Sequence, residues 1–136
     1  MRIIALLSLS WIALAGTSVV AQGDGLEQQL AGTFVVEGIG PRGDTYEYET
    51  IVTRRDGVYE VQWRTRAGNV DWVGIGFVNA GQFVVGIAGG GGHLGTGLYT
   101  VTNLNPLTLT GRYIIWNMAQ PASETWTRKA DRIARE

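Results

Sequence analysis

The chain contains no cysteine and a single histidine, His93, and Ser123 is the only serine after residue 18. Without cysteine it can form neither a disulfide framework nor a lipid-modified N-terminal cysteine. A lone histidine argues against zinc, which normally draws on several His or Cys ligands. A Ser123–His93 pair would place the base in a glycine-rich segment with no group to orient it. We therefore predict a protein that is not an enzyme, with no catalytic residue, metal site or cofactor.

Charge of either sign is also scarce. The formal net charge is −1, and Lys129 is the only lysine. Loss of a signal segment containing Arg2 and no acidic residue would lower the net charge to about −2, which is too close to neutral for electrostatic capture of a polyanion. We expect no nucleic-acid partner.

Only one long apolar run is present, from Ile3 to Ala15, and it follows a single charge. This order, with the small residues before Ala21, is typical of a secretory signal peptide. The run is shorter than the roughly 20 residues that span a bilayer, which disfavours the alternative of an uncleaved anchor. We predict cleavage before Gln22, a secreted or periplasmic location, and no stable membrane insertion afterwards. The expected organisation is a signal peptide (1–21), an N-terminal lead-in (22–31), one β-domain (32–128) and a charged C-terminal tail (129–136).

One local pattern recurs five times: glycine, any residue, an aromatic, any residue, then valine or isoleucine. Alternation with period two places the aromatic and the branched residue on the same face of a strand, and the glycine permits the positive φ of a turn or bulge. Each copy therefore predicts a strand that begins at a turn or bulge. The five copies begin at Gly32, Gly57, Gly81, Gly97 and Gly111.

Turn-forming segments separate the strands that this pattern predicts. Short turns between consecutive strands indicate antiparallel neighbours, and strands without covering helices must hide their edges. The sequence therefore predicts an all-β fold, a single antiparallel up-and-down β-barrel of about eight strands. Only 26–30 and 128–136 carry helical signals. The expected strands are 32–38, 45–53, 58–65, 70–78, 82–88, 97–102, 107–116 and 123–128.

An outer-membrane barrel is the structural alternative, because eight strands suffice for one. A lipid-facing exterior should be apolar across the middle of each strand. The alternation instead places polar residues outside, namely Glu47, Glu49, Glu60, Gln62 and Arg64. These residues favour a barrel whose outer face is exposed to solvent.

Two further motifs have ordinary structural interpretations. The run from Gly89 to Gly97 lacks the Gly-Lys-Ser/Thr ending of a phosphate-binding loop, so we predict a flexible linker that could cover a barrel mouth. The tripeptide Arg42-Gly43-Asp44 matches an integrin-recognition sequence, but after Pro41 it is also good turn chemistry. Of the carboxylates, Glu47, Glu49, Glu60 and Glu124 could supply an acid/base pair, and we predict that all four are surface charges.

The aromatic residues indicate the best candidate site. Trp63 alternates with apolar residues and is expected in the core, whereas other rings should lie toward strand ends, where a barrel opens. Tryptophan and tyrosine combine a large apolar body with one polar group and suit a pocket for an amphipathic ligand. They would serve equally well as plugs that fill the barrel end. The candidate ligand-binding residues are Tyr46, Tyr48, Trp72, Trp116 and Trp126.

The glycines and aromatics from Gly32-Thr33-Phe34 through Tyr59-Glu60-Val61-Gln62-Trp63 and Gly74-Ile75-Gly76 to Leu109-Thr110-Gly111 resemble a family of small exported bacterial proteins of unknown function. Some members are labelled fibronectin-binding, and the family's strand pattern is similar to avidin and lipocalin barrels. The chain departs from the family in its Gly89–Gly92 run and in having Arg112-Tyr113 after Gly111. The resemblance implies an avidin/lipocalin-like barrel and transfers no ligand-binding residue.

Together these patterns predict an exported binding protein. Its partner would be a small apolar or amphipathic ligand at the barrel mouth, or an extracellular protein. The alternatives are a structural module of the cell envelope that binds only proteins, with a homo-oligomer possible, and a carboxylate-based hydrolase.

Overall fold

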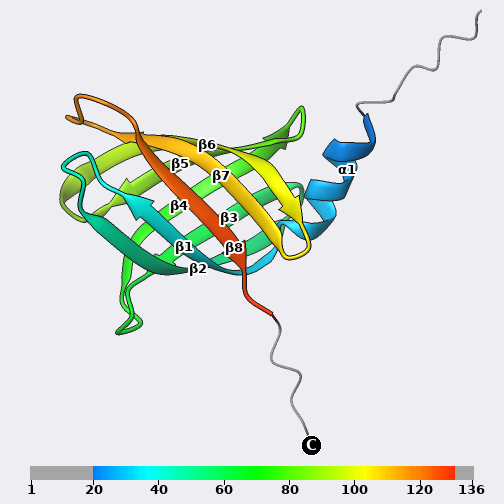
Figure 1. The fold of residues 1–136 in the computed structure, drawn as a ribbon, viewed down its shortest axis with the longest axis horizontal. Helices are drawn as coiled ribbons and strands as arrows, with labels where there is room; N and C mark the ends of the chain where they lie inside the picture. The colour runs from blue at the N-terminus through cyan, green and yellow to red at the C-terminus, as the bar shows by residue number, and fades with distance from the viewer. Residues whose placement is uncertain (1–19, 131–136) are drawn as a thin grey trace, which may run out of the picture.

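The computed structural model describes residues 20–130, and their side chains from Gly25 onward. Eight antiparallel strands each pair with the next along the chain, and β1 pairs with β8 to close the barrel (Figure 1). The predicted fold class is confirmed. The elements are α1 (Val20–Gln29), β1 (Gly32–Ile39), β2 (Thr45–Arg55), β3 (Val58–Arg64), β4 (Val70–Asn79), β5 (Gln82–Gly89), the 3-10 turn η1 (Gly90–Gly92), β6 (His93–Leu104), β7 (Leu107–Ile115) and β8 (Ala122–Arg128).

The predicted alternation builds the barrel interior. The aromatic of each repeated motif points inward, and four of these five rings are completely or almost completely buried. The rings of Phe83 and Tyr99 lie 6.0 and 4.9 Å from that of Trp126 in β8, which also contacts Phe34 and Trp63. Aromatic packing therefore fills the middle of the barrel and the half next to α1.

The glycines of the repeat have two different roles. Gly57 and Gly81 have positive φ, as the turn interpretation predicts. Gly111 does not, and it faces the interior where a Cβ would lie 2.1 Å from the Leu98 carbonyl oxygen and 2.4 Å from the Tyr99 ring. For this copy the turn interpretation is wrong, because the missing side chain makes room for a neighbouring strand and a buried ring.

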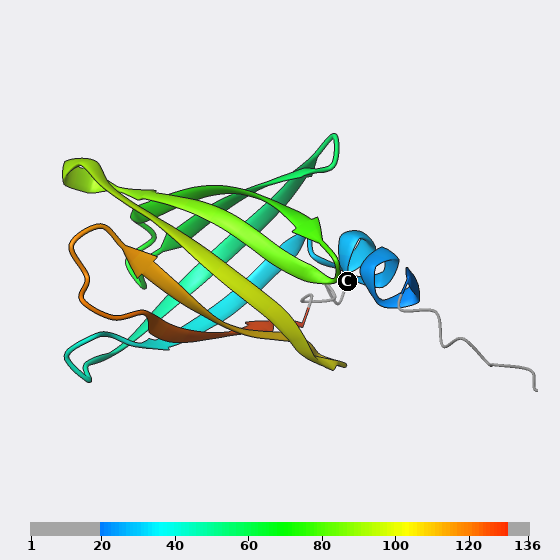
Figure 2. The ribbon, with the colours of Figure 1, turned by 90° about the horizontal axis from the view of Figure 1, so that it is seen from above.

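Helix α1 covers one end of the barrel (Figures 1 and 2). Leu26 and Leu30 are buried in the core, and the Tyr59 hydroxyl donates a 2.7 Å hydrogen bond to the Glu27 carbonyl oxygen. The predicted lead-in is therefore a helical plug. No helix within residues 20–130 is long and apolar enough to cross a membrane.

Two sequence predictions at the ends of the chain fall largely outside the described residues. The predicted signal peptide lies mostly in residues 1–19, and its predicted cleavage site falls within α1. The predicted C-terminal helix begins at Arg128, which instead ends β8, and residues 131–136 are not described.

The predicted flexible linker at Gly89–Gly97 is wrong. β5 and β6 form a hairpin in which Gly89 pairs with His93, so only the three residues of η1 connect them. Gly95 and Gly97 belong to β6, where a Cβ would meet the side chains of Ile115 and Tyr99 respectively. These glycines thus serve close packing within the wall.

The outer surface has two unlike halves. On β2 and β3 the acidic and polar residues expected outside do lie there, with Glu60 paired to Arg55 at 3.2 Å and Glu49 paired to Lys129. The outward residues of β4–β7 instead include a large group of apolar side chains, and this group was not predicted from the sequence. We call this second surface the apolar face, and its register brings together Val73, Ile75, Phe77, Val84, Ala88, Leu94, Leu98 and Ile114.

The fold predicts that the same substitution has a large effect at one strand glycine and almost none at another. Gly111→Ala should lower the free energy of unfolding by about 3 kcal/mol, because its new methyl group meets backbone that cannot move aside cheaply. Gly86→Ala should change it by less than about 0.5 kcal/mol, because its nearest neighbour would be 3.8 Å away. Urea unfolding of both variants measures the difference in the free energy of unfolding. Equal effects would contradict the inward orientation of Gly111.

Candidate functional site

A cavity opens at the end of the barrel opposite α1. Its volume is about 740 Å³, and the β1–β2 and β7–β8 loops contribute to its rim. Trp63 and Glu124 are its most buried lining residues, with exposed fractions of 2% and 7%. The lining consists of Pro41, Arg42, Asp44, Tyr46, Tyr48, Trp63, Trp72, Ile87, His93, Tyr113, Ile115, Trp116, Asn117, Met118, Ala119 and Glu124.

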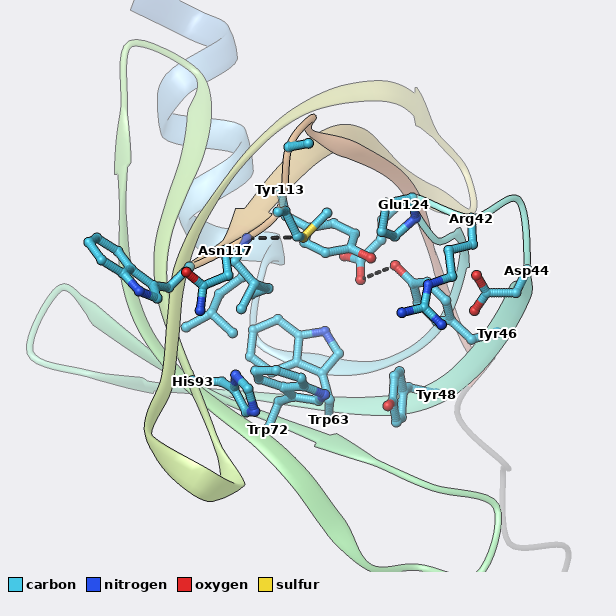
Figure 3. Close-up of a pocket in the computed structure, with 16 residues that line it drawn as sticks. Arg42, Asp44, Tyr46, Tyr48, Trp63, Trp72, His93, Tyr113, Asn117 and Glu124 are labelled. Carbon is cyan, nitrogen blue, oxygen red and sulfur yellow. Dashed lines mark hydrogen bonds between the residues drawn. The ribbon is translucent and has the colours of Figure 1, made fainter.

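Glycines on neighbouring strands make room for two aromatic side chains of the cavity wall. The Tyr46 ring lies over its partner Gly38, where a Cβ would be 2.1 Å from the ring, and the Trp72 ring lies over its partner Gly89 at 2.4 Å. Any side chain at these glycines would displace the ring. Trp72 also lies 6.3 Å from the His93 ring, and Tyr46 lies 5.7 Å from the Tyr48 ring (Figure 3). The cavity walls are thus held by strand register.

Glu124 lies between the cavity and the packed core and accepts three hydrogen bonds. Its Oε1 accepts from the Tyr46 hydroxyl at 2.9 Å (Figure 3). Its Oε2 accepts from the Tyr99 hydroxyl at 2.7 Å and from Trp126 Nε1 at 3.0 Å. Three donors offset part of the cost of burying a carboxylate. The network also fixes the ring planes on either side of the cavity floor.

The tyrosine hydroxyls around Glu124 are held in their neutral, donating form. Burial raises the pKa of Tyr99 and Tyr46 well above the usual phenol value, and the nearby negative charge of Glu124 raises each further. Burial likewise raises the pKa of Tyr113, whose ring lies 6.4 Å from that of Tyr46. The cavity therefore offers hydroxyl groups and a buried acidic side chain beside apolar ring faces.

Four of the five ligand-binding residues predicted from sequence line this cavity. Tyr46, Tyr48 and Trp72 form its walls, while Trp116 lies at the rim and is 76% exposed. Trp126 lies away from the barrel mouth. It is completely buried, because it sits in the middle of β8 with its ring among those of the core.

The central polar residue of the cavity was not predicted from the sequence. Glu124 was predicted to be a surface charge, and this was wrong, since Ala122, Glu124 and Trp126 alternate on the inner face of β8. That same alternation could have indicated its burial. Tyr113 was also missed as a lining residue, although its place in the repeat predicts an inward ring.

No group of three or more His, Asp or Glu side chains within residues 20–130 could hold a metal ion. The His93 ring lies against Trp72, and the described contacts place no nucleophile beside it. The cavity presents the faces of aromatic rings and a buried carboxylate.

Comparisons with known proteins show the fold alone. No protein-family model matches the chain. No curated protein matches it significantly in sequence. Among solved structures, it is similar to a de novo designed fluorescence-activating β-barrel, with a TM-score of 0.61 and 15% identity over 77% of this chain and 98% of that one. It is also similar to EF1p2_mFAP2b bound to DFHBI, with a TM-score of 0.60 and 17% identity over 79% of this chain and 99% of that one.

The buried tyrosines predict a loss of stability at alkaline pH. Below about pH 10 folded and unfolded chains both keep their phenol protons. Above it the unfolded chain releases them while Tyr99 and Tyr46 retain theirs, because their folded pKa is raised. The free energy of unfolding should therefore be steady to about pH 9 and then fall by up to about 1.4 kcal/mol per pH unit for each such tyrosine.

Urea unfolding from about pH 8 to pH 11 measures this fall. Tyr99→Phe is the matched variant, because it removes one titrating hydroxyl and should make the decline shallower. A free energy of unfolding that stays level to pH 11 would show that the hydroxyls are not protected as the structure indicates.

Proposed function

We infer that the protein is an exported binding protein that takes a small apolar or amphipathic ligand into the open end of its barrel. The observation that carries this proposal is the cavity of about 740 Å³, within the usual size range of ligand pockets, walled by Tyr46, Tyr48, Trp72 and Tyr113. Export follows from the predicted signal peptide and places the binding step outside the cytoplasm.

The shape of the barrel interior supports this function over a channel. Trp63 and Trp126 pack at right angles, 5.6 Å apart, and block the lumen below the cavity. Helix α1 covers the far end. A ligand would therefore enter and leave through the same mouth. The fold is similar to that of EF1p2_mFAP2b bound to DFHBI, which supports the idea that a barrel of this fold can bind a small ligand.

Binding can be tested with N-phenyl-1-naphthylamine, a neutral aromatic dye whose emission rises in apolar surroundings. We expect saturable binding that Trp72→Ala weakens about tenfold, because one wall ring is lost. Phe77→Ala removes an outward ring from the same strand and should leave the affinity unchanged. Native mass spectrometry of protein purified from its own host should show a bound small molecule.

Absence of dye binding together with an empty native protein would contradict the proposal. Equal losses in Trp72→Ala and Phe77→Ala would place the dye outside the cavity.

A second candidate function rests on the apolar face. Ile75, on the β4 edge of this face, is 61% exposed, and contiguous apolar patches on soluble proteins mark interaction sites. The outward residues that pair across β4 to β7 on this face include one charged side chain, Arg112, which lies on β7 at the edge of the face. Two copies can therefore face each other across a twofold axis without bringing many like charges together. The proposed partner is a second copy of this chain.

Sedimentation equilibrium over a range of concentrations tests this pairing. We expect a reversible dimer that Val84→Asp converts to a monomer, because a charge would be buried between Phe77 and Leu98 in the contact. Thr45→Asp, at an exposed outward position of β2, is the control and should leave the dimer intact. A wild-type chain that stays monomeric at all concentrations contradicts this second function.

A further inference from the structure

We propose that the ligand of the cavity is an organic cation, an aromatic or apolar molecule with an ammonium or amidinium group that binds Glu124. The proposal rests on the binding function above and specifies the ligand's charge. It starts from a feature that a purely apolar pocket would not need, namely a carboxylate at the cavity floor that is only 7% exposed.

Among the described residues, Glu124 has hydrogen-bond donors but no cationic partner. The ion pairs among residues 20–130 join Arg55 to Glu60 and Lys129 to Glu49, and neither includes Glu124. Its three donors, two hydroxyls and an indole N–H, are all neutral. A buried carboxylate without a counter-charge is costly. A cation arriving with the ligand would supply the missing charge.

The carboxylate also has an open acceptor position. An ionised carboxylate offers about four lone-pair positions. Oε2 accepts from Tyr99 and Trp126, whereas Oε1 accepts only from Tyr46. The open position is therefore on the oxygen shared with Tyr46, a residue of the cavity wall. An N–H group of a bound ligand can occupy it.

The charges around this position favour a cation. Glu37 and Glu47 face each other across β1 and β2 on the outer side of the wall, next to the Gly38–Glu124 pair. At the rim Asp71 accepts a hydrogen bond from Tyr48, and Asp44 lines the mouth. Arg42 is the one arginine or lysine among the lining residues, and it lies in the exposed β1–β2 loop (Figure 3). Arg112 lies on the outer side of the wall, next to the Gly111–Glu124 pair, and even with it the acidic residues of this group outnumber the basic ones.

The ring faces complete a cation site. Tyr46, Tyr113, Trp63 and Trp72 line the space above the carboxylate, and aromatic faces attract ammonium and guanidinium groups. The same rings accommodate the apolar body of the ligand. A molecule that carries its charge at one end of a flat ring system would satisfy both parts of the cavity.

Three probes with one ring system test the proposal in the wild-type protein. They are naphthalene-2-methylammonium, naphthalene-2-methanol and naphthalene-2-carboxylate, and calorimetry at neutral pH measures their affinities. We expect the ammonium to bind about tenfold or more tightly than the alcohol, because it makes a charged hydrogen bond. We expect the carboxylate to bind most weakly. Equal affinities for ammonium and alcohol would overturn the cation assignment but leave ligand binding standing, whereas no binding by any probe would count against the binding function itself.

Variants locate the charge that the ligand recognises. Glu124→Gln keeps the shape of the side chain and should bring the ammonium to within about twofold of the alcohol. Asp56→Asn removes the same unit charge from the β2–β3 turn at the opposite end and should leave the preference intact. Equal loss of the preference in both variants would indicate only a general effect of net charge and would overturn the assignment.

A second variant keeps the test decisive if Glu124→Gln does not fold. Tyr46→Phe removes the only donor to Oε1 and leaves that oxygen to the ligand. The ammonium preference should then persist or increase. Its disappearance would show that the hydroxyl, not the carboxylate, recognises the ligand. If the carboxylate probe binds best and Arg42→Ala removes that binding, the rim arginine sets the ligand charge and the proposal is wrong.

Discussion

The contact on which the structure depends is that of Trp126 with the rings around it in the middle of the barrel. Its indole packs on Tyr99 at 4.9 Å and against Trp63, while its N–H is directed to Glu124. A barrel of eight strands is just wide enough for side chains to fill its interior. The Trp126 cluster fills this interior on the side of α1 and leaves it hollow on the other side. One packed layer therefore serves as the centre of the core and as the floor of the candidate site.

The same layer explains why a carboxylate can be buried in a chain without disulfide crosslinks. The aromatic residues that fill the barrel carry polar groups, and Tyr46, Tyr99 and Trp126 direct theirs to Glu124. Hydrophobic packing and polar recognition are thus built from the same side chains. A site placed on rigid strands in this way keeps its geometry without a ligand, which is favourable for binding because little ordering remains to be done.

The glycines of the barrel wall have different roles on its inner and outer faces. Interior glycines such as Gly38 and Gly89 make room for the rings that shape the cavity. On the exterior, Gly86 lies at the centre of an apolar surface that spans β4 to β7. The acidic half over β1–β3 and this apolar half give the molecule two distinct surfaces. The cavity and the apolar face are separate features of the molecule.

The sequence alone determined the number of strands, their approximate positions except for the start of β6, and the antiparallel closure, because period-two alternation and turn chemistry act over a few residues. It also indicated Tyr46, Tyr48, Trp72 and Trp116, since rings near strand ends lie at a barrel mouth. Only the tertiary structure decided that Glu124 is buried, that Trp126 belongs to the core and that β4–β7 carry an apolar exterior. These three features depend on which residues of distant strands lie at the same height along the barrel axis. That height is set by the strand register of the closed barrel, which no local sequence pattern contains.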